Sequence, residues 1–459
     1  MSRPVREPTL GGCPNDMRPQ NPALFVAPPI RPPAGAPARR TITGFQWVCQ
    51  NMPRPAEGRE MGAAMSQLDD LDLYHIDSMI TGEERMIRDT VHRWTVERVL
   101  PNIEDWAWNE HFPVELVPEM ADLGLLGANF SEYGLPGLGG VGYGLINQEL
   151  ERADSGLRSF VSVQSALVMY PILQWGSKDQ RDRWIPRLGR GQSIGCFGLT
   201  EPDFGSNPGG MRTKAVEDGN GWVLNGEKAW ITNGSIADIA VVWAKTRHGV
   251  RGFLVERGTP GFSTIDHRGK YSLRASVTSH LVFEDCRIPR DAILPGTTGL
   301  KNPLMCLTQA RYGIAWGAIG SAMALFSAAR DYAITRLQFG GRPIAAHQLQ
   351  QEKLVWMYSE IVKGQLLVLQ LGRMKDAGTM THQAVSLAKR NNVWVARECA
   401  KLAREIHGAN GISNEYPVMR HLMNLETVYT YEGTHDIHTL ILGHYLTGLS
   451  AFDPPHSAS

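Results

Sequence analysis

The feature that most constrains the fold is a change in the spacing of apolar residues along the chain. From near Thr81 to about residue 190 they recur at helical spacing, and from about residue 195 to 300 they form short runs bounded by polar residues or glycine. After Pro303 the helical spacing returns over longer stretches. Because helices and strands repeat with different periods, this order predicts helices, then a β region, then a helical bundle.

The first helical region has a recognisable start. Thr81 and Glu84 stand three residues apart, as in a capping box, where each side chain accepts a hydrogen bond from the other residue's backbone. Helical spacing then continues to Pro101, where we expect the helix to end, through Met86, Ile87, Val91, Trp94 and Val99. The glycine-rich stretch 134–144 contains no phosphate-binding motif, and we predict a loop there.

The middle region carries the strand signals. Residues 222–224 and 229–232 are apolar runs that flank Asn225 and Gly226. Asn-Gly is favoured in two-residue turns because both positions tolerate positive φ, so we predict a tight hairpin. Residues 239–243, 252–255 and 281–283 are further runs of the kind expected in strands.

Three apolar stripes mark the C-terminal helices, and stripes of this kind are typical of bundle core. They comprise Ala315, Ala318, Ile319, Ala322, Phe326, Ala329 and Ala333; Leu354, Met357, Tyr358, Ile361 and Val362; and Val395, Ala396, Cys399, Ala400 and Ala403. We therefore predict an N-terminal helical domain over residues 66–193, a β domain over 194–302 and a helical domain over 303–459.

Composition argues against several kinds of partner and site. The chain has 46 Lys and Arg against 46 Asp and Glu, so it has no basic excess for phosphates and we expect no nucleic-acid partner. It has no run of about 18 apolar residues, so we expect no transmembrane helix and no membrane partner. The six cysteines contain no CxxC pair and favour reduced thiols over disulfides or a metal site: Cys13, Cys49, Cys196, Cys286, Cys306 and Cys399.

The first 60 residues differ from the rest. They hold 12 of the 28 prolines and eight arginines, with no lysine and four acids. Such a segment buries too little apolar surface to order itself, and we predict a disordered extension over residues 1–65. Two other interpretations are open: a transit peptide, against which the prolines argue, and untranslated sequence before a start at Met61 or Met65. We favour an extension that is dispensable or spurious.

One acidic residue, Glu432, stands among apolar ones. Leu422, Met423 and Leu425 precede it, and Leu440, Ile441 and Leu442 follow. Gly433 lets the backbone approach a ligand closely, and a desolvated carboxylate is a stronger proton acceptor. This combination suits a base that removes a weakly acidic proton beside a carbonyl. From these residues alone, a solvated loop acid is the alternative.

Residues 431–438, Tyr-Glu-Gly-Thr-His-Asp-Ile-His, resemble the catalytic segment of the acyl-CoA dehydrogenases, and most closely that of the glutaryl-CoA dehydrogenases. The resemblance covers roughly residues 70–452 and includes, in the family's order, residues 196–202, 230–233, 270–276, 310–316 and 410–413. It implies an α+β multidomain fold: an N-terminal α-helical domain, a central β domain and a C-terminal four-helix bundle with the catalytic glutamate.

The resemblance also implies a reaction, in which an acyl-CoA thioester is dehydrogenated between its α and β carbons. Glu432 matches the base that removes the α-proton, and FAD accepts the hydride. In the glutaryl branch the product loses CO₂, so that glutaryl-CoA becomes crotonyl-CoA in the degradation of lysine, tryptophan and glutarate. The expected partners are electron-transferring flavoprotein and three further copies in a homotetramer. The expected location is the cytoplasm of a bacterium or the mitochondrial matrix of a eukaryote.

The resemblance assigns cofactor contacts along the whole chain. Residues 197–200 match the segment beside the isoalloxazine ring, and Trp230 and Thr232 match the pair that covers it near N5. Arg336 and Gln348 match positions for the diphosphate and adenine end, often across a subunit interface, where the donor fork of arginine fits phosphate. The full set is Phe197, Leu199, Thr200, Ser206, Trp230, Thr232, Arg336, Gln348, Glu405, Gly408, Ala409, Thr434 and Phe452.

Substrate choice is expected to depend on Arg158 and Ser159, which match a pair that meets the far carboxylate of the glutaryl chain. An arginine facing a buried pocket without an anion would be costly, so we expect a dicarboxylic substrate. Glu151 matches an acidic pocket position that could influence proton return. The set expected at the substrate is Glu151, Arg158, Ser159, Ser206, Arg311, Tyr431 and Gly433.

Two positions depart from the family pattern. Leu157, followed by Phe160, stands where tyrosine is common, and Asn207 stands where an acid is usual. The exact diacid, the completion of decarboxylation and the electron acceptor are therefore open. Alternatives are a dehydrogenase for another short or dicarboxylic acyl-CoA, an oxidase, and an inactive relative that acts in assembly.

Overall fold

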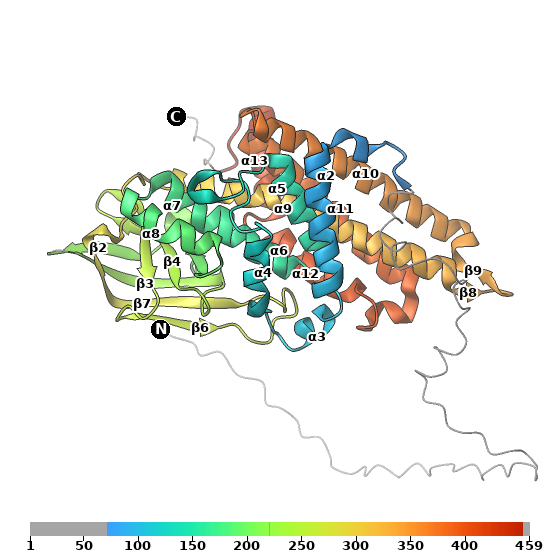
Figure 1. The fold of residues 1–459 in the computed structure, drawn as a ribbon, viewed down its shortest axis with the longest axis horizontal. Coiled ribbons are helices and arrows are strands. Elements are labelled where there is room, and N and C mark those ends of the chain that lie inside the picture. The colour runs from blue at the N-terminus through green and yellow to red at the C-terminus, as the bar shows by residue number, and fades with distance from the viewer. Residues whose placement is uncertain (1–70, 220, 453–459) are drawn as a thin grey trace, which may run out of the picture. The chain divides into compact units, whose positions relative to one another are not determined.

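The computed structural model describes residues 71–219 and 221–452, so the predicted extension 1–65 lies outside the described residues. The N-terminal part is helical (Figure 1). Its helices are α2 (Gly82–Trp94), α3 (Ile103–Trp108), α4 (Val117–Asp122), α5 (Gly140–Ala153), α6 (Ser155–Ser162), α7 (Tyr170–Trp175) and α8 (Lys178–Gly189). A π-helical turn, Thr95–Val99, extends α2, and another, Val163–Met169, joins α6 to α7.

The start of α2 is as the sequence predicts. The Thr81 hydroxyl accepts a hydrogen bond from the backbone N–H of Glu84 at 3.2 Å, and the Glu84 carboxylate accepts one from the N–H of Thr81 at 2.8 Å. The capping box is therefore confirmed. Glu84 also accepts from Arg373 of α10 (Gln348–Asp376) at 2.8 Å, so the same carboxylate links two helices.

The loop predicted over residues 134–144 is wrong in its second half, because α5 begins at Gly140. Its glycines permit close packing. A Cβ on Gly140 would lie 2.9 Å from the carbonyl oxygen of Gly372, and one on Gly144 would lie 2.2 Å from the ring of Trp316. The glycines signal helix contacts here, not a turn.

The middle part is a seven-stranded sheet with the order β1-β4-β2-β3-β7-β6, and β5 pairs with β4. Its strands are β1 (Gly195–Gly198), β2 (Lys214–Asp218), β3 (Gly221–Thr232), β4 (Ile239–Thr246), β5 (Gly249–Glu256), β6 (Phe262–Asp266) and β7 (Thr278–Pro289). The pairs of β4 with β1 and β2 are parallel, and the others are antiparallel. Figure 1 shows these strands at one end of the described chain and the long helices at the other.

The tight hairpin predicted at Asn225 and Gly226 is wrong. Both residues lie inside β3, where the register against β7 shifts between Leu224 and Gly226. Gly226 has a φ of 139°, and a Cβ there would lie 2.6 Å from the Cα of Thr213. The pair therefore lies opposite a β-bulge whose extra residue is on β7, and the glycine permits a close backbone approach to Thr213.

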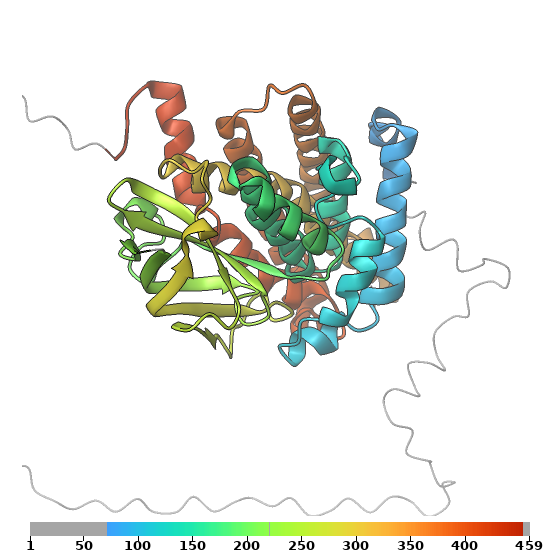
Figure 2. The ribbon, with the colours of Figure 1, turned by 60° about the vertical axis from the view of Figure 1, so that its left-hand side comes forward.

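The C-terminal part consists of α9 (Lys301–Thr335), α10 (Gln348–Asp376), α11 (His382–His407), α12 (Val418–Thr430) and α13 (His435–Thr447). A short hairpin, β8 (Leu337–Gln338) and β9 (Arg342–Pro343), joins α9 to α10. The three predicted stripes lie on α9, α10 and α11, and α9 contacts both other helices as well as α5 (Figure 2).

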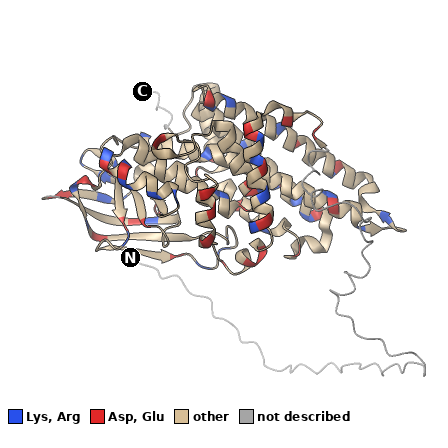
Figure 3. Ribbon diagram, in the orientation of Figure 1, with Lys and Arg blue, Asp and Glu red and all other residues tan. Residues whose placement is uncertain are grey.

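Helix α9 is the only helix in the described ranges that is long and apolar enough to cross a membrane by length and composition. However, 83% of its most apolar 18-residue window is buried inside the protein. Elsewhere, lysines and arginines are interspersed with acids on both strands and helices (Figure 3). Within residues 71–219 and 221–452, no group of three or more His, Cys, Asp or Glu side chains is placed to hold a metal ion.

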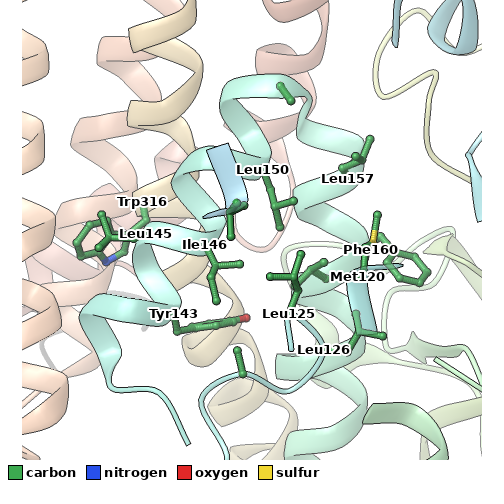
Figure 4. Close-up of a cluster of buried hydrophobic side chains, with 14 of the residues drawn as sticks. Met120, Leu125, Leu126, Tyr143, Leu145, Ile146, Leu150, Leu157, Phe160 and Trp316 are labelled. Atoms are coloured by element: carbon green, nitrogen blue, oxygen red, sulfur yellow. The ribbon is translucent and has the colours of Figure 1, made fainter. Parts of the chain in front are cut away.

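The contact between α5 and α9 is unusually close. A Cβ on Gly320 would lie 1.9 Å from the carbonyl oxygen of Gln148, and one on Gly317 would lie 2.1 Å from Oε2 of Glu151. Beside this contact, α5 contributes Tyr143, Leu145, Ile146 and Leu150 to a buried apolar cluster that includes Trp316 of α9 (Figure 4). Glycine thus lets the two helix backbones meet while the larger side chains pack to either side.

We predict that Gly320→Ala destabilises the protein by about 1–3 kcal/mol, because the new methyl group meets backbone that cannot rotate away. Thermal unfolding of the purified protein measures the effect. Gly443→Ala on α13 is the matched control, since a Cβ there meets no atom within 4 Å. This control should be neutral or up to about 1 kcal/mol more stable. Equal melting temperatures for Gly320→Ala and wild type would contradict the close contact.

Candidate active site

Glu432 lies in the short connection between α12 and α13. Its φ is 53°, and that of Gly433 is 96°. A Cβ on Gly433 would lie 3.0 Å from Nε2 of His438 and 3.1 Å from Nη2 of Arg311. Glycine is therefore required at position 433 both by the backbone conformation and by the lack of space.

Two cations hold the backbone of this turn. Nε of Arg311, on α9, donates to the carbonyl oxygen of Glu432 at 2.6 Å. Nζ of Lys389, on α11, donates to the carbonyl oxygen of Gly433 at 2.7 Å and also to that of Tyr431. Three consecutive carbonyls are thus bound by side chains of two different helices.

The carboxylate of Glu432 is available for proton transfer. Its Oε2 atom is buried and has no hydrogen-bond partner among the described residues. Burial raises the pKa of Glu432, while the positive charges of Arg158, Lys389 and Arg311 oppose that rise. A carboxylate with a raised pKa accepts a proton more readily, so the surroundings favour the base role that the sequence suggests.

Arg158 is fully buried and lies beside the turn. Its Nε donates to Oε2 of Glu151 at 2.6 Å, and its Nη2 donates to the hydroxyl of Tyr431. Oε1 of Glu151 also accepts from Ser155 at 3.0 Å. Glu151 already supplies an anion to Arg158, so the charge of Arg158 alone does not require a substrate anion. What the pair leaves open is Nη1 of Arg158, which is buried and has no partner within the described part of the chain.

Three polar residues of this region had no motif to reveal them. Tyr143 is buried near Glu432 and Arg158, and burial raises its pKa to about 12, so its phenol stays protonated. Asn147 lies one turn further along α5, and its Oδ1 is 2.8 Å from the Cβ position of Gly313. For Lys389 the sequence did offer one signal. It occupies a position on the buried face of α11, where a lysine is unusual unless it has a partner.

On the β side, Trp230 presents an exposed ring. It is 63% exposed, has a φ of 60°, and stacks on His267 with ring centroids 4.4 Å apart and planes 10° apart. A strand register shift between Lys228 and Ile231 produces this geometry. Thr232 lies two residues on at the end of the same strand, paired with Thr278 of β7.

The segment that follows β1 is fixed by one buried ion pair. Glu201 binds Lys228 at 2.8 Å and accepts from the backbone N–H of Thr213 at 2.9 Å. Although burial acts to raise it, these hydrogen bonds and one from the N–H of Arg212 lower the pKa of Glu201 to about 2. Glu201 therefore binds both Lys228 of β3 and the backbone at Thr213. These contacts fix the two ends of the loop that follows Thr200 and contains the exposed Ser206.

The remaining predicted cofactor residues fall into three places. Phe197 and Leu199 point into the buried core beneath the sheet. Thr434 caps α13, since its hydroxyl accepts from the N–H of Ile437 at 3.1 Å. The others are exposed at helix ends or near the end of the described chain: Arg336, Gln348, Glu405, Gly408, Ala409 and Phe452. Arg336 and Gln348 flank the β8–β9 hairpin, which Figure 1 shows far from the sheet, so one chain does not bring them to Trp230.

All three parts of the chain match models of one family. The N-terminal domain of the acyl-CoA dehydrogenases matches residues 81–192, the middle domain residues 196–286 and the C-terminal domain residues 297–446. The chain belongs to the acyl-CoA dehydrogenase family. Its α-helical, β and α-helical parts are the three domains of that fold, as the sequence predicted.

Individual relatives agree with this assignment. The human mitochondrial short-chain specific acyl-CoA dehydrogenase is 37% identical over 347 residues, which are 73% of this chain and 84% of the relative. A glutaryl-CoA dehydrogenase structure from Mycobacterium smegmatis is 52% identical, with a TM-score of 0.81 over 82% of this chain and 98% of that one. Another from the same organism, in complex with FADH2, is 48% identical, with a TM-score of 0.82 over 83% and 99%.

FAD is the cofactor of this acyl-CoA dehydrogenase. The structure fits it: the exposed, flat ring of Trp230 offers a face to a planar ring system, and the held segment with Thr200 and Ser206 lies on the same domain. The exposed Arg336 supplies donors of the kind that bind a diphosphate. Bound FAD accepts the hydride; the chain itself supplies the base, the anchoring groups and the exclusion of water.

We predict that Glu432→Gln still binds FAD but loses turnover by at least about 100-fold, because a general base contributes about 10²–10⁴-fold. Flavin absorbance and steady-state rates of the purified protein measure both quantities. Asp436→Asn is the control, since Asp436 is exposed in the first turn of α13; it should stay within about twofold of wild type. A Glu432→Gln enzyme that keeps more than about a tenth of the wild-type rate would remove Glu432 from the base role.

Proposed function

We propose that this acyl-CoA dehydrogenase oxidises and decarboxylates glutaryl-CoA to crotonyl-CoA and CO₂. One observation carries the proposal: the buried Nη1 of Arg158 lacks a partner among the described residues and lies on a guanidinium that also touches the turn of the base. A buried donor without a partner is costly, and a carboxylate at the end of a short acyl chain would satisfy it. The similarity to two glutaryl-CoA dehydrogenase structures supports this choice.

In this mechanism the residues act in sequence. Arg158 and Ser159 bind the distal carboxylate, which places the α-carbon of the thioester beside Glu432. Glu432 removes the α-proton while the hydride leaves the β-carbon, which gives an unsaturated thioester that still carries the carboxylate. The bond to CO₂ then breaks, its electron pair is delocalised into the thioester carbonyl, and uptake of one proton completes crotonyl-CoA.

A second candidate is dehydrogenation of a neutral short-chain acyl-CoA. Glu151 neutralises Arg158 without help from a substrate, so the pocket does not require a second carboxylate. The human relative named above is a short-chain specific enzyme, which agrees with this alternative.

The two candidates are separated by the ratio of kcat/KM for glutaryl-CoA to that for pentanoyl-CoA. Arg158→Met alone would leave Glu151 as a buried, unpaired charge and risks unfolding. The informative comparison is therefore wild type against the double variant Glu151→Gln, Arg158→Met, which leaves neither charge without its partner. We predict that the double change lowers glutaryl-CoA use by about 10–150-fold, the loss of one charge-assisted contact of roughly 1.5–3 kcal/mol, and leaves pentanoyl-CoA use steady or improved.

Product mass under anaerobic conditions completes this test. Crotonyl-CoA from glutaryl-CoA supports the proposal, and an unsaturated product that keeps its carboxylate shows dehydrogenation without decarboxylation. If both substrates lose kcat/KM by the same factor, Arg158 is a structural residue and the neutral short-chain assignment is preferred.

We also propose that the enzyme is a homotetramer that passes electrons to electron-transferring flavoprotein. Support for the tetramer comes from exposed apolar side chains in and beside the β8–β9 hairpin, and from the exposure of the predicted diphosphate and adenine contacts in one chain. These apolar residues are Ile334, Leu337, Phe339, Leu349 and Val355.

If a neighbouring subunit completes the cofactor site, Arg336→Ala should lower FAD retention and tetramer content together. Analytical ultracentrifugation with flavin absorbance measures both in one run. Arg190→Ala, at an exposed arginine that ends α8, is the control and should change neither. A stable monomer with a full complement of FAD would contradict the shared site.

A further inference from the structure

Within residues 71–219 and 221–452, Lys389 is the one buried cation of the active site that no motif assigned. It lies on α11 and is 1% exposed. Its Nζ donates hydrogen bonds to the carbonyls of the residues immediately before and after Glu432. Its ammonium also lies 5.7 Å from the ring centroid of Tyr431. The lysine therefore touches the backbone on both sides of Glu432 and belongs to a different helix.

A capping role for Lys389 explains only half of this arrangement. Cations are favoured at helix C-termini, and Tyr431 is the C-terminal cap of α12, so its carbonyl is such a site. Gly433 lies beyond the helix, and its carbonyl has no such reason to attract a buried lysine. The positive φ of Glu432, a residue with a Cβ, also costs free energy that something must offset.

We propose that Lys389 is a positioning residue for Glu432: its bonds to the two flanking carbonyls hold the base in its left-handed conformation, and its charge keeps the carboxylate ready to accept a proton. The proposal rests on the assignment of Glu432 as the base. It goes beyond that assignment because a helix distant in the sequence then determines both the position and the charge of the base.

The charges around the turn support a coupling of these two groups. Burial lowers the pKa of Lys389; the negative charge of Glu432 acts against this, whereas Arg311 and Arg158 add to it. In return, Lys389 is one of the cations that oppose the burial-driven rise in the pKa of Glu432. The other groups that face the turn are Glu151, Tyr143, His435 and His438, and burial lowers the pKa of both histidines, so they stay neutral.

Removing the Lys389 charge takes away a group that favours the carboxylate, so the pKa of Glu432 rises. Glu432 is active as the carboxylate, and the acid limb of the kcat profile should therefore move to higher pH. Loss of the two hydrogen bonds should also let the base drift, and a displacement of about 1 Å can cost on the order of 100-fold in rate.

The test uses the FAD-loaded full chain with whichever acyl-CoA it turns over, so an error in the substrate assignment does not affect it. Lys389→Met removes charge and donors, Lys389→Gln keeps a donor without charge, and Lys389→Arg keeps both. We expect Lys389→Met to lower kcat by about 10–100-fold with KM nearly unchanged, and to shift the acid limb upward. In Lys389→Gln the acid limb should stay at the higher pH while part of kcat is recovered. In Lys389→Arg the acid limb should return to its wild-type pH.

Lys375→Met is the matched control, since Lys375 also has a pKa lowered by burial, to about 8, but donates to the Gln309 side chain at 2.8 Å. Its acid limb should not move. An unmoved acid limb in both Lys389→Met and Lys389→Gln, or a limb that stays shifted in Lys389→Arg, would overturn the proposal. If Lys389→Met fails to bind FAD, the comparison of Lys389→Gln with Lys389→Arg tests the proposal by itself. An active Glu432→Gln enzyme would instead refute the base assignment itself.

Discussion

The close packing of α5 against α9 determines the positions of the charged groups in the active site. Glycines on α9 let the carbonyl of Gln148 and the carboxylate of Glu151 approach the helix backbone, which no other residue type would permit. Glu151 then pairs with Arg158, which binds Tyr431, and the same α9 carries Arg311 to the turn of Glu432. A shift of one helix by a fraction of a residue would therefore disturb Glu432 and Arg158 together.

The active site holds more positive than negative charge before a ligand is considered. Arg158, Arg311 and Lys389 surround the turn, and Glu151 and Glu432 oppose them. Burial makes each charge expensive unless it is paired or hydrogen-bonded. Arg311 and Lys389 donate hydrogen bonds to backbone carbonyls of the turn, which offsets part of this cost. The groups that hold the backbone of Glu432 are therefore also groups that change its pKa.

Sequence reasoning gave the order of helical and β regions, the capping box at Thr81 and the three stripes of the bundle, because each depends on a local period or a local hydrogen bond. It failed at Asn225 and Gly226 and at residues 140–144. Glycine in both places serves a close approach to a partner distant in sequence, such as Trp316, and no local pattern encodes that partner. Lys389 was also missed, although its place among the buried positions of α11 was a usable signal. The pairing of Glu151 with Arg158 spans only seven residues, but it crosses from α5 to α6, and the sequence did not predict how these two helices meet.

The Glu151–Arg158 pair has a consequence for how such a pocket can change during evolution. Because the arginine is neutralised from within the protein, the folded state does not depend on which acyl chain is present. Under the proposed role of Arg158, a lineage can change between neutral and acidic substrates through substitutions around its Nη1 atom, and no intermediate sequence needs to leave a buried charge without a partner. The pair would then separate the choice of substrate from the stability of the fold.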